Sequence, residues 1–479
     1  MFVRRCFLIV LSLVLLTQGV LAKDRTLPNV VLVLADNLGT GDIGCYGSKL
    51  HRTPNIDQIA AEGTKFTSFY VTSGVCTPSR ASLMTGCYAQ RLNMHISDKG
   101  ASVLQPVATK GLHPDELTLA ELFKQRGYRT ACYGKWHLGD QLEFLPTRQG
   151  FDDFLGVPYS EDMVKELRPD QWPELPLMRN EEVIEAPVDC EKLTRIYTEA
   201  AVDFISESKG KPFFLYLPMA RPGSTKVVHV DNAFRGKSAN GLYGDCVEEL
   251  DWSMGEILKA LKAADIESNT LVVWTSDNGA VNRNPQQGSN APYKGWGYGT
   301  SEGGMRMPCV MRWPGVVPKG HVCDAVSTTL DFWPTFYGVL GLEFDDALKR
   351  DGHDMQSIWF AEAGTDSPYD KTGFFYYHMA QLQAVRRGPW KLYLPLEPQP
   401  LPNGRKTKEQ TLQLFDVRND VSEEHEASAV QPEVVAQLLE LAEQARADLG
   451  DEGRVGAGQR PAGFVASPTQ RVLGSANGR

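Results

Sequence analysis

The stretch NVVLVLAD, residues 29–36, decides the fold class of this chain. Its unbroken run of aliphatic residues ends at an acid and is followed by Gly39, Gly41 and Gly44. Such a run is typical of a strand that is buried on both faces of a parallel sheet, because a half-exposed strand alternates apolar with polar residues. We therefore expect the carboxyl end of this strand to open into a loop where α/β proteins bind their ligands.

The same pattern recurs further along the chain. KPFFLYLPM at 211–219 and NTLVVWTSDNG at 269–279 predict strands, and ELTLAELFKQRG at 116–127 and DWSMGEILKALKAAD at 251–265 predict amphipathic helices. Alternation of strand and helix predicts an α/β fold, with a large, mostly parallel sheet covered by helices on both faces.

The C-terminal part has a different composition. The whole chain has 479 residues. This length favours more than one packed unit, because single hydrophobic cores stop growing at roughly 250–300 residues. Aromatic, alternating segments at 372–396 predict a smaller antiparallel sheet, and a final helix is expected at about 432–449. We expect an N-terminal α/β domain over 23–365, a smaller α+β subdomain over 366–450, and a disordered tail over 451–479, which is poor in large apolar residues.

The first 22 residues have the features of a secretory signal peptide. Arg4 and Arg5 precede an apolar run over 6–16, and Val-Leu-Ala at 20–22 fits a cleavage site near Ala22. The apolar run is shorter than the ~20 residues that a membrane-spanning helix needs. The sequence predicts a secreted or periplasmic protein without a membrane anchor in its mature form.

The net charge limits the partners of the protein. Loss of the first 22 residues removes two arginines and no acid, so the formal charge moves from −10 to −12. An acidic protein has no general attraction for nucleic acid, and an anionic substrate must be bound by a local cationic group.

Residues 76–80, CTPSR, match the C-x-P-S-R signature in which a maturation enzyme oxidises the cysteine to formylglycine. Three further segments occur around it in a fixed order: PNVVLVLADNLGTGDIGCYGS at 28–48, GYRTACYGKWHLGD at 127–140 and LVVWTSDNGA at 271–280. Together they resemble the sulfatase family of the alkaline phosphatase superfamily. The late segments QAVRRGPWKLYL and LFDVRNDVSEEHEAS resemble the C-terminal subdomain of that family.

Two predicted strands end in short oxygen-bearing side chains of the kind that Ca²⁺ accepts as ligands. The resemblance implies that one Ca²⁺, with Mg²⁺ as the alternative ion, is held by Asp36, Asn37, modified Cys76, Asp277 and Asn278. The family usually has a second aspartate where this chain has Asn37. We expect the loss of that charge to weaken metal binding.

The resemblance also implies the catalytic residues. Formylglycine made from Cys76 would act as a hydrate, in which one hydroxyl attacks sulfur and the other later expels sulfate. Arg80, one helical turn on, would stabilise the hydrate or the metal-bound oxygens. Lys135 would bind a sulfate oxygen and His137 would orient or deprotonate the nucleophile, both from one face of an extended segment.

Two segments depart from the family pattern. Arg-Pro-Gly-Ser-Thr at 221–225 replaces the Pro-His-x-Pro segment whose histidine protonates the leaving oxygen, and Gly-Trp-Gly-Tyr at 295–298 lacks the second sulfate-binding lysine. Lys226, His229 and Lys294 lie close by in the sequence and are the candidate replacements for substrate binding. Tyr293, Trp296 and Tyr298 are candidates for an aromatic wall against a sugar ring.

The sequence as a whole favours a secreted sulfatase that hydrolyses a sulfate ester, on a carbohydrate or another small molecule, after activation by a formylglycine-generating enzyme. Two alternatives stay open. One is a phosphomonoester or phosphonate hydrolase on the same scaffold. The other is a degenerate member of the family that binds sulfated glycans without turnover.

Overall fold

The computed structural model describes residues 27–208, 210–225, 228–284, 286–342, 349–361, 366–397 and 409–474. The expected signal peptide lies outside these residues. Within them, no helix is both long enough and apolar enough to cross a membrane. The eight cysteines that fall in the described part are all free.

The buried strand β1 (Asn29–Asp36) occupies the middle of an eleven-stranded sheet. It runs parallel to β8 (Phe213–Pro222) on one side and to β9 (Thr270–Ser276) on the other. Beyond β8, the strands β4 (Arg129–Lys135) and β5 (Asp153–Val157) continue the parallel arrangement. The predicted parallel core is confirmed, and it brings the carboxyl ends of these strands to one edge.

The margins of the sheet are mixed. Antiparallel pairs join β9 to β10, β10 to β2, β5 to β6 and β6 to β7, whereas β11 and β12 run parallel to β2. The bounds of these strands are Thr64–Tyr70 (β2), Leu177–Arg179 (β6), Glu182–Glu185 (β7), Arg306–Arg312 (β10), His321–Cys323 (β11) and Ser327–Thr328 (β12).

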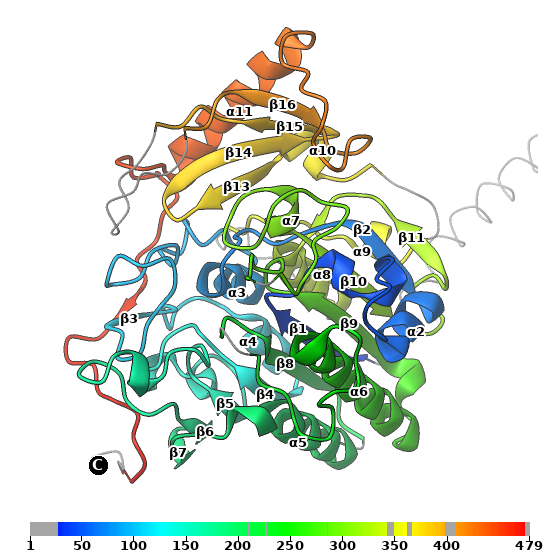
Figure 1. Ribbon diagram of the computed structural model, residues 1–479, viewed down its shortest axis with the longest axis vertical. Helices are drawn as coiled ribbons and strands as arrows, with labels where there is room; N and C mark the ends of the chain where they lie inside the picture. The colour runs from blue at the N-terminus through cyan, green and yellow to red at the C-terminus, as the bar shows by residue number, and fades with distance from the viewer. Residues whose placement is uncertain are drawn as a thin grey trace, which may run out of the picture.

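Helices cover both faces of the sheet (Figure 1). Side chains alternate along β1: Val31 and Val33 belong to one buried core, and Leu32 and Leu34 belong to the other. The first core includes side chains of α2, α5 and α6, and the second includes side chains of α3, α4 and α8. The bounds of these helices are Pro54–Glu62 (α2), Cys76–Thr85 (α3), Leu119–Lys124 (α4), Leu193–Glu207 (α5), Gly241–Ala263 (α6) and Phe332–Val339 (α8).

A four-stranded antiparallel sheet forms the smaller C-terminal unit, at the top of Figure 1. Its strands follow chain order, and the helix α11 (Pro432–Leu449) packs against β14 and β15. Both the antiparallel sheet and the final helix are confirmed. The strand bounds are Phe374–His378 (β13), Gln381–Arg387 (β14), Trp390–Tyr393 (β15) and Gln413–Asp416 (β16).

A buried ion network joins the two sheets at Glu302, the first residue of α7 (Glu302–Met305). Its carboxylate accepts hydrogen bonds from Lys391 Nζ at 3.0 Å and from the Tyr376 hydroxyl at 3.0 Å. Burial alone would raise the pKa of Glu302, but the charges of Lys391, Arg306 and Arg386 outweigh burial and lower it to about 2. Glu302 is therefore ionised at neutral pH, where it stabilises the contact between the two units.

The expectation of a disordered tail is wrong for residues 451–474. The short strand β17 (Gly463–Phe464) pairs with β3 (Lys110–Gly111) of the larger domain. Arg460 donates to both carboxylate oxygens of Glu116, at 2.7 and 2.8 Å, and Arg471 Nε donates to a backbone carbonyl at 2.8 Å. Hydrogen bonds and ion pairs hold this segment, and apolar content does not reveal such contacts.

Candidate active site

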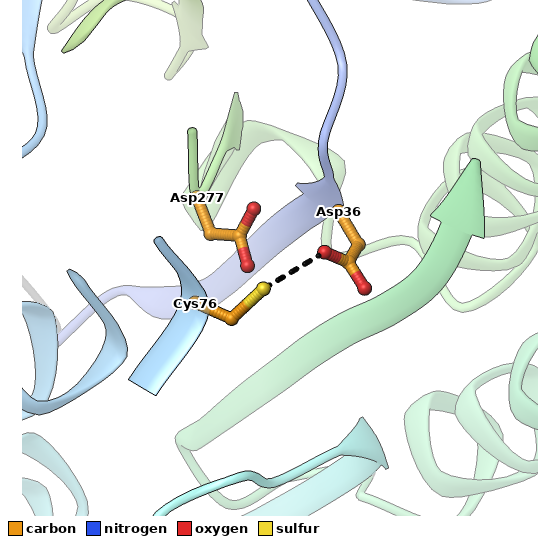
Figure 2. A group of neighbouring side chains, drawn as sticks. All are labelled: Asp36, Cys76 and Asp277. Atoms are coloured by element: carbon orange, nitrogen blue, oxygen red, sulfur yellow. Dashed lines mark hydrogen bonds between the residues drawn. The ribbon is translucent and has the colours of Figure 1, made fainter. Parts of the chain in front are cut away.

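Asp36 and Asp277 meet at the carboxyl edge of the sheet because β1 and β9 are parallel neighbours. Asp36 is the last residue of β1 and Asp277 directly follows β9. Cys76 begins α3, and its side chain points between the two carboxylates (Figure 2). Ligand atoms of the three residues lie within 4.8 Å of one another, and the thiol donates to Asp36 Oδ1 at 3.4 Å.

The two asparagines complete the group of predicted metal residues. Asn37 donates its backbone N–H to Asp277 Oδ1 at 3.1 Å, and Asn278 Nδ2 donates to Asn37 Oδ1 at 2.5 Å. The Asn278 side-chain oxygen lies 3.9 Å from Cys76 Sγ. The structure thus brings all five residues together.

Two buried cations face these carboxylates. Arg80 donates from Nε and Nη2 to Asp277 Oδ2 at 3.0 and 2.8 Å. Lys135 Nζ lies 2.5 Å from Asp36 Oδ2 and 3.6 Å from Cys76 Sγ. Lys135 also lies 3.7 Å from the buried carboxylate of Glu161, a residue that no motif had indicated.

The charges of the site set its protonation. Burial would raise the pKa of Asp36, but Lys135 and Arg80 lower it, so Asp36 is ionised. Burial and the negative charge of Asp36 raise the pKa of Asp277. Burial and both carboxylates raise the pKa of the Cys76 thiol well above its usual value, so the unmodified cysteine is not a thiolate.

The donor set fits a hard divalent cation. Two carboxylates and two amide oxygens converge on one edge, and such oxygens are the ligands that Ca²⁺ and Mg²⁺ take. Burial and the neighbouring charge of Asp36 both disfavour the ionised form of Asp277. Added positive charge would therefore be favourable here.

His137 reaches the site by a different backbone path from the one expected. The strand β4 ends at Lys135, and His137 has a left-handed φ of 62°, so the two side chains do not alternate along an extended segment. Nε2 lies 2.9 Å from the carbonyl oxygen of Leu104, while Nδ1 is buried without a hydrogen-bond partner. Burial and the charge of Lys135 lower the pKa of His137, so the ring is neutral, and Nε2 must carry the proton to donate to that carbonyl. Nδ1 is then a free acceptor.

A cavity of about 200 Å³ opens above Cys76. His137, Ser224 and Tyr298 line it, and His378 reaches it from the end of β13 in the C-terminal sheet. The sequence indicates neither Ser224 nor His378 as a site residue, because Ser224 lies where the chain departs from the Pro-His-x-Pro segment and His378 lies in another unit. The tyrosine predicted as part of an aromatic wall does line the cavity.

The other candidate substrate-binding residues lie elsewhere. His229 lines a separate cavity with Cys190. Lys294 Nζ donates to the backbone oxygen of Glu423 at 3.3 Å and lies over the Phe415 ring, so it faces the C-terminal unit. Lys226 lies outside the described residues.

At both departing positions the structure has a glycine closely surrounded by other groups. A Cβ on Gly223 would lie 1.9 Å from Glu161 Oε1, and a Cβ on Gly297 would lie 2.3 Å from the Gly279 carbonyl oxygen. Neither position has room for a side chain. In each loop the next residue, Ser224 or Tyr298, lines the cavity.

A parallel sheet between helices, with acidic residues and a helix N-terminus meeting at its carboxyl edge, defines a hydrolase of the alkaline phosphatase superfamily. The family model described as Sulfatase matches residues 28–342. The N-acetylgalactosamine-6-sulfatase of Canis lupus familiaris is 36% identical over 381 residues, which cover 76% of this chain and 71% of that protein. The chain belongs to the sulfatase family and is a sulfuric ester hydrolase.

Further similarities agree with this assignment. The steryl-sulfatase of Homo sapiens is 32% identical over 448 residues, covering 76% of each protein. The crystal structure of Ps i-CgsB in complex with k-i-k-neocarrahexaose superposes with a TM-score of 0.73 at 28% identity and covers 88% of this chain and 92% of that one.

Proposed function

We propose that the protein is a secreted, divalent-cation-dependent sulfatase whose nucleophile is formylglycine made from Cys76. The observation that carries the proposal is the position of Cys76. It is the first residue of α3, its sulfur lies 3.4 Å from Asp36 Oδ1, and it belongs to the C-T-P-S-R sequence. A maturation enzyme would supply the modification before or during folding, because Cys76 is buried in the folded chain.

The metal would be held by Asp36, Asn37, Asp277 and Asn278 together with the modified residue 76. Bound there, Ca²⁺ or Mg²⁺ would polarise sulfate oxygens and favour ionisation of the attacking hydroxyl. The position of these four side chains agrees with this role, because they surround residue 76, the proposed nucleophile.

The remaining polar groups have separate roles in this proposal. Lys135 supplies a positive charge 3.6 Å from the sulfur of residue 76, where it can hold a sulfate oxygen. Arg80 fixes the Asp277 carboxylate through two hydrogen bonds. Nδ1 of His137 has a free lone pair in the same cavity and can accept the proton of the attacking hydroxyl.

A sulfated carbohydrate is the substrate class that we favour. Relatives named as N-acetylgalactosamine-6-sulfatases and the similar structure with k-i-k-neocarrahexaose support it. Tyr298, which is 44% exposed, presents an aromatic side chain at the cavity. Aromatic faces of this kind pack well against apolar sugar faces.

Two measurements test the proposal. Co-expression with a formylglycine-generating enzyme should give a residue-76 peptide lighter by exchange of sulfur for oxygen and loss of two hydrogens. The matured protein should release sulfate from sulfated sugars or aryl sulfates, and Cys76→Ala should abolish release without loss of the folded state. Unchanged turnover by Cys76→Ala would exclude the mechanism.

The same preparation separates the two alternatives. Faster hydrolysis of an aryl phosphate than of the matching aryl sulfate would favour the phosphoester hydrolase. Binding of a sulfated oligosaccharide with no sulfate released over a long incubation would favour the non-catalytic binder, for which the missing histidine and lysine are the motive.

A further inference from the structure

Ser224 and Tyr298 form a pair of hydroxyls above residue 76. Their oxygens lie 2.9 Å apart, although the residues belong to two loops 74 positions apart in the sequence. Both line the cavity that contains Cys76, and both follow a glycine whose position has no room for a side chain. The pair therefore occupies the region that the two departures from the family pattern leave without a histidine and a lysine.

One hydroxyl hydrogen of the Ser224–Tyr298 pair is not used in the hydrogen bond between the two residues. Asn37 Nδ2 donates to Ser224 Oγ at 2.9 Å, so the serine oxygen already accepts one hydrogen bond. Each hydroxyl carries one proton, and the bond between them uses only one of the two. When Ser224 donates to the tyrosine oxygen, the Tyr298 proton is free to be donated into the cavity.

The backbone of Tyr298 is held in an unfavourable conformation. Its φ is 70°, in the left-handed region that bulky residues rarely adopt. Hydrogen bonds from Tyr298 N to the Gly74 carbonyl at 2.8 Å and from Gly297 N to the Ala280 carbonyl at 2.9 Å hold the loop. Such strain persists where the surrounding structure fixes it, and it is concentrated at functional sites.

Asn37 fits this arrangement better than aspartate would. An amide can offer its oxygen to a cation and its N–H to Ser224, whereas an ionised carboxylate has no hydrogen to donate. Position 37 thus carries one negative charge fewer than is usual in the family, and its amide instead donates a hydrogen bond to Ser224. Asn37 and the residues that follow the two departing glycines therefore form one hydrogen-bonded chain, Asn37–Ser224–Tyr298.

We propose that Tyr298 is the catalytic proton donor to the leaving-group oxygen, and that Ser224 and Asn37 position it. This rests on the proposed sulfatase function. Burial raises the pKa of Tyr298 above the ordinary tyrosine value near 10, so the hydroxyl carries its proton at neutral pH and can give it to a leaving alkoxide that is more basic still.

The step balances without another reactant. A bond forms between sulfur and the attacking oxygen, and the bond between sulfur and the leaving oxygen breaks with both electrons staying on that oxygen. The leaving oxygen takes the proton from Tyr298 Oη, while His137 Nδ1 accepts the proton of the attacking hydroxyl, and return of that proton to the tyrosinate restores both residues. The second hydroxyl of residue 76 then re-forms the aldehyde as hydrogen sulfate leaves, and water hydrates the aldehyde again. Overall, ester and water give alcohol and hydrogen sulfate.

His378 is the competing donor, since it lines the same cavity. Burial lowers its pKa, which disfavours the protonated ring that general-acid catalysis would need. We therefore favour Tyr298, and His378 enters the test as a variant.

The test compares Tyr298→Phe with the matured wild type on phenyl sulfate, a poor leaving group, and on 4-nitrophenyl sulfate, a good one. We expect kcat/KM of the variant to fall on the order of tenfold more for phenyl sulfate than for 4-nitrophenyl sulfate, because a good leaving group needs little protonation. Ser224→Ala should show the same selectivity with a smaller loss. Tyr293→Phe is the matched control, because Tyr293 lies in the same loop as Tyr298 but does not line the cavity, and its hydroxyl donates to the carbonyl of Thr67 in β2 at 2.9 Å.

The outcomes distinguish this inference from the proposed function. An inactive wild type with modified residue 76 would overturn both. If the wild type is active, two results would overturn the assignment of Tyr298 alone. One is an equal loss of kcat/KM on the two esters for Tyr298→Phe. The other is leaving-group selectivity in His378→Gln in place of Tyr298→Phe. Thermal midpoints equal to that of the wild type exclude misfolding as the cause.

Discussion

Arg80 and Asp277 form a fully buried ion pair in which Nε and Nη2 of the guanidinium share one carboxylate oxygen, at 3.0 and 2.8 Å. The other oxygen of Asp277 accepts from the backbone N–H of Asn37 at 3.1 Å. One carboxylate therefore connects the helix that carries residue 76 to the end of the central strand, which makes the pair a structural link within the proposed active site.

Arg80→Ala should destabilise the fold strongly, because it leaves Asp277 buried without its partner. Breaking a buried pair typically costs about 3–5 kcal/mol. Urea unfolding at pH 7 with and without Ca²⁺ measures the effect. We expect Ca²⁺ to restore part of the lost stability, because the ion would balance the unpaired negative charge of Asp277. An equal loss of stability with and without Ca²⁺ would argue against a cation beside Asp277.

Asn37→Asp should strengthen metal binding and weaken the hydrogen-bonded chain to Tyr298. The added charge should lower the Ca²⁺ dissociation constant on the order of tenfold, which corresponds to about 1.4 kcal/mol. Calorimetric titration of chelator-treated protein gives the constant. Because Ser224 loses its donor, the variant should also turn over phenyl sulfate less well than 4-nitrophenyl sulfate, relative to wild type. Unchanged affinity would remove residue 37 from the metal site.

Glu302→Gln tests the contact between the two units and its pH dependence. The folded-state pKa of Glu302 is lowered from the ordinary 4.5 to about 2, so the stabilisation is present above pH 4.5 and is lost as pH falls toward 2. The shift corresponds to stabilisation on the order of 3 kcal/mol. The difference in unfolding free energy between wild type and variant should therefore shrink on acidification from pH 5 to pH 3. A constant difference over that range would contradict the ionised state of Glu302.

Removal of the chain after Gly450 should lower the thermal midpoint. The segment contributes the Arg460–Glu116 pair and the β17–β3 ladder, and its loss exposes residues that it covers. We expect a decrease of several degrees by differential scanning calorimetry, on the order of 1–3 kcal/mol for this class of loss. Arg460→Lys, which keeps the charge, is the matched control. An unchanged midpoint would instead support the expectation of a disordered tail.

Much of the fold could be predicted from the sequence because local patterns coincide with buried structure. The β1 run is aliphatic throughout because both of its faces are covered, and Asp36 and Asp277 lie together because parallel strands end at one edge. The same rule places the proposed metal residues Asp36, Asn37, Asp277 and Asn278 at strand ends, whereas Cys76 was indicated by the C-T-P-S-R motif and the ligand set by the family resemblance. Patterns of this kind describe one element and the direction of its neighbours.

The remainder depends on contacts between distant residues. Glu161 has no motif, yet its carboxylate fills the space beside Gly223, and His378 reaches the cavity from a separate sheet. Nearness in sequence suggested His229 and Lys294, but the chain turns their side chains toward other surfaces. The ordered C-terminal segment is held by ion pairs and backbone hydrogen bonds, which apolar content does not report.

The chemical identity of residue 76 is the most direct test of the account. Mass spectrometry of the peptide that contains residues 76–80, from protein matured with a formylglycine-generating enzyme and active in sulfate release, should show the aldehyde in place of the thiol. Sulfate release by protein whose residue 76 is still an unmodified cysteine would contradict the account.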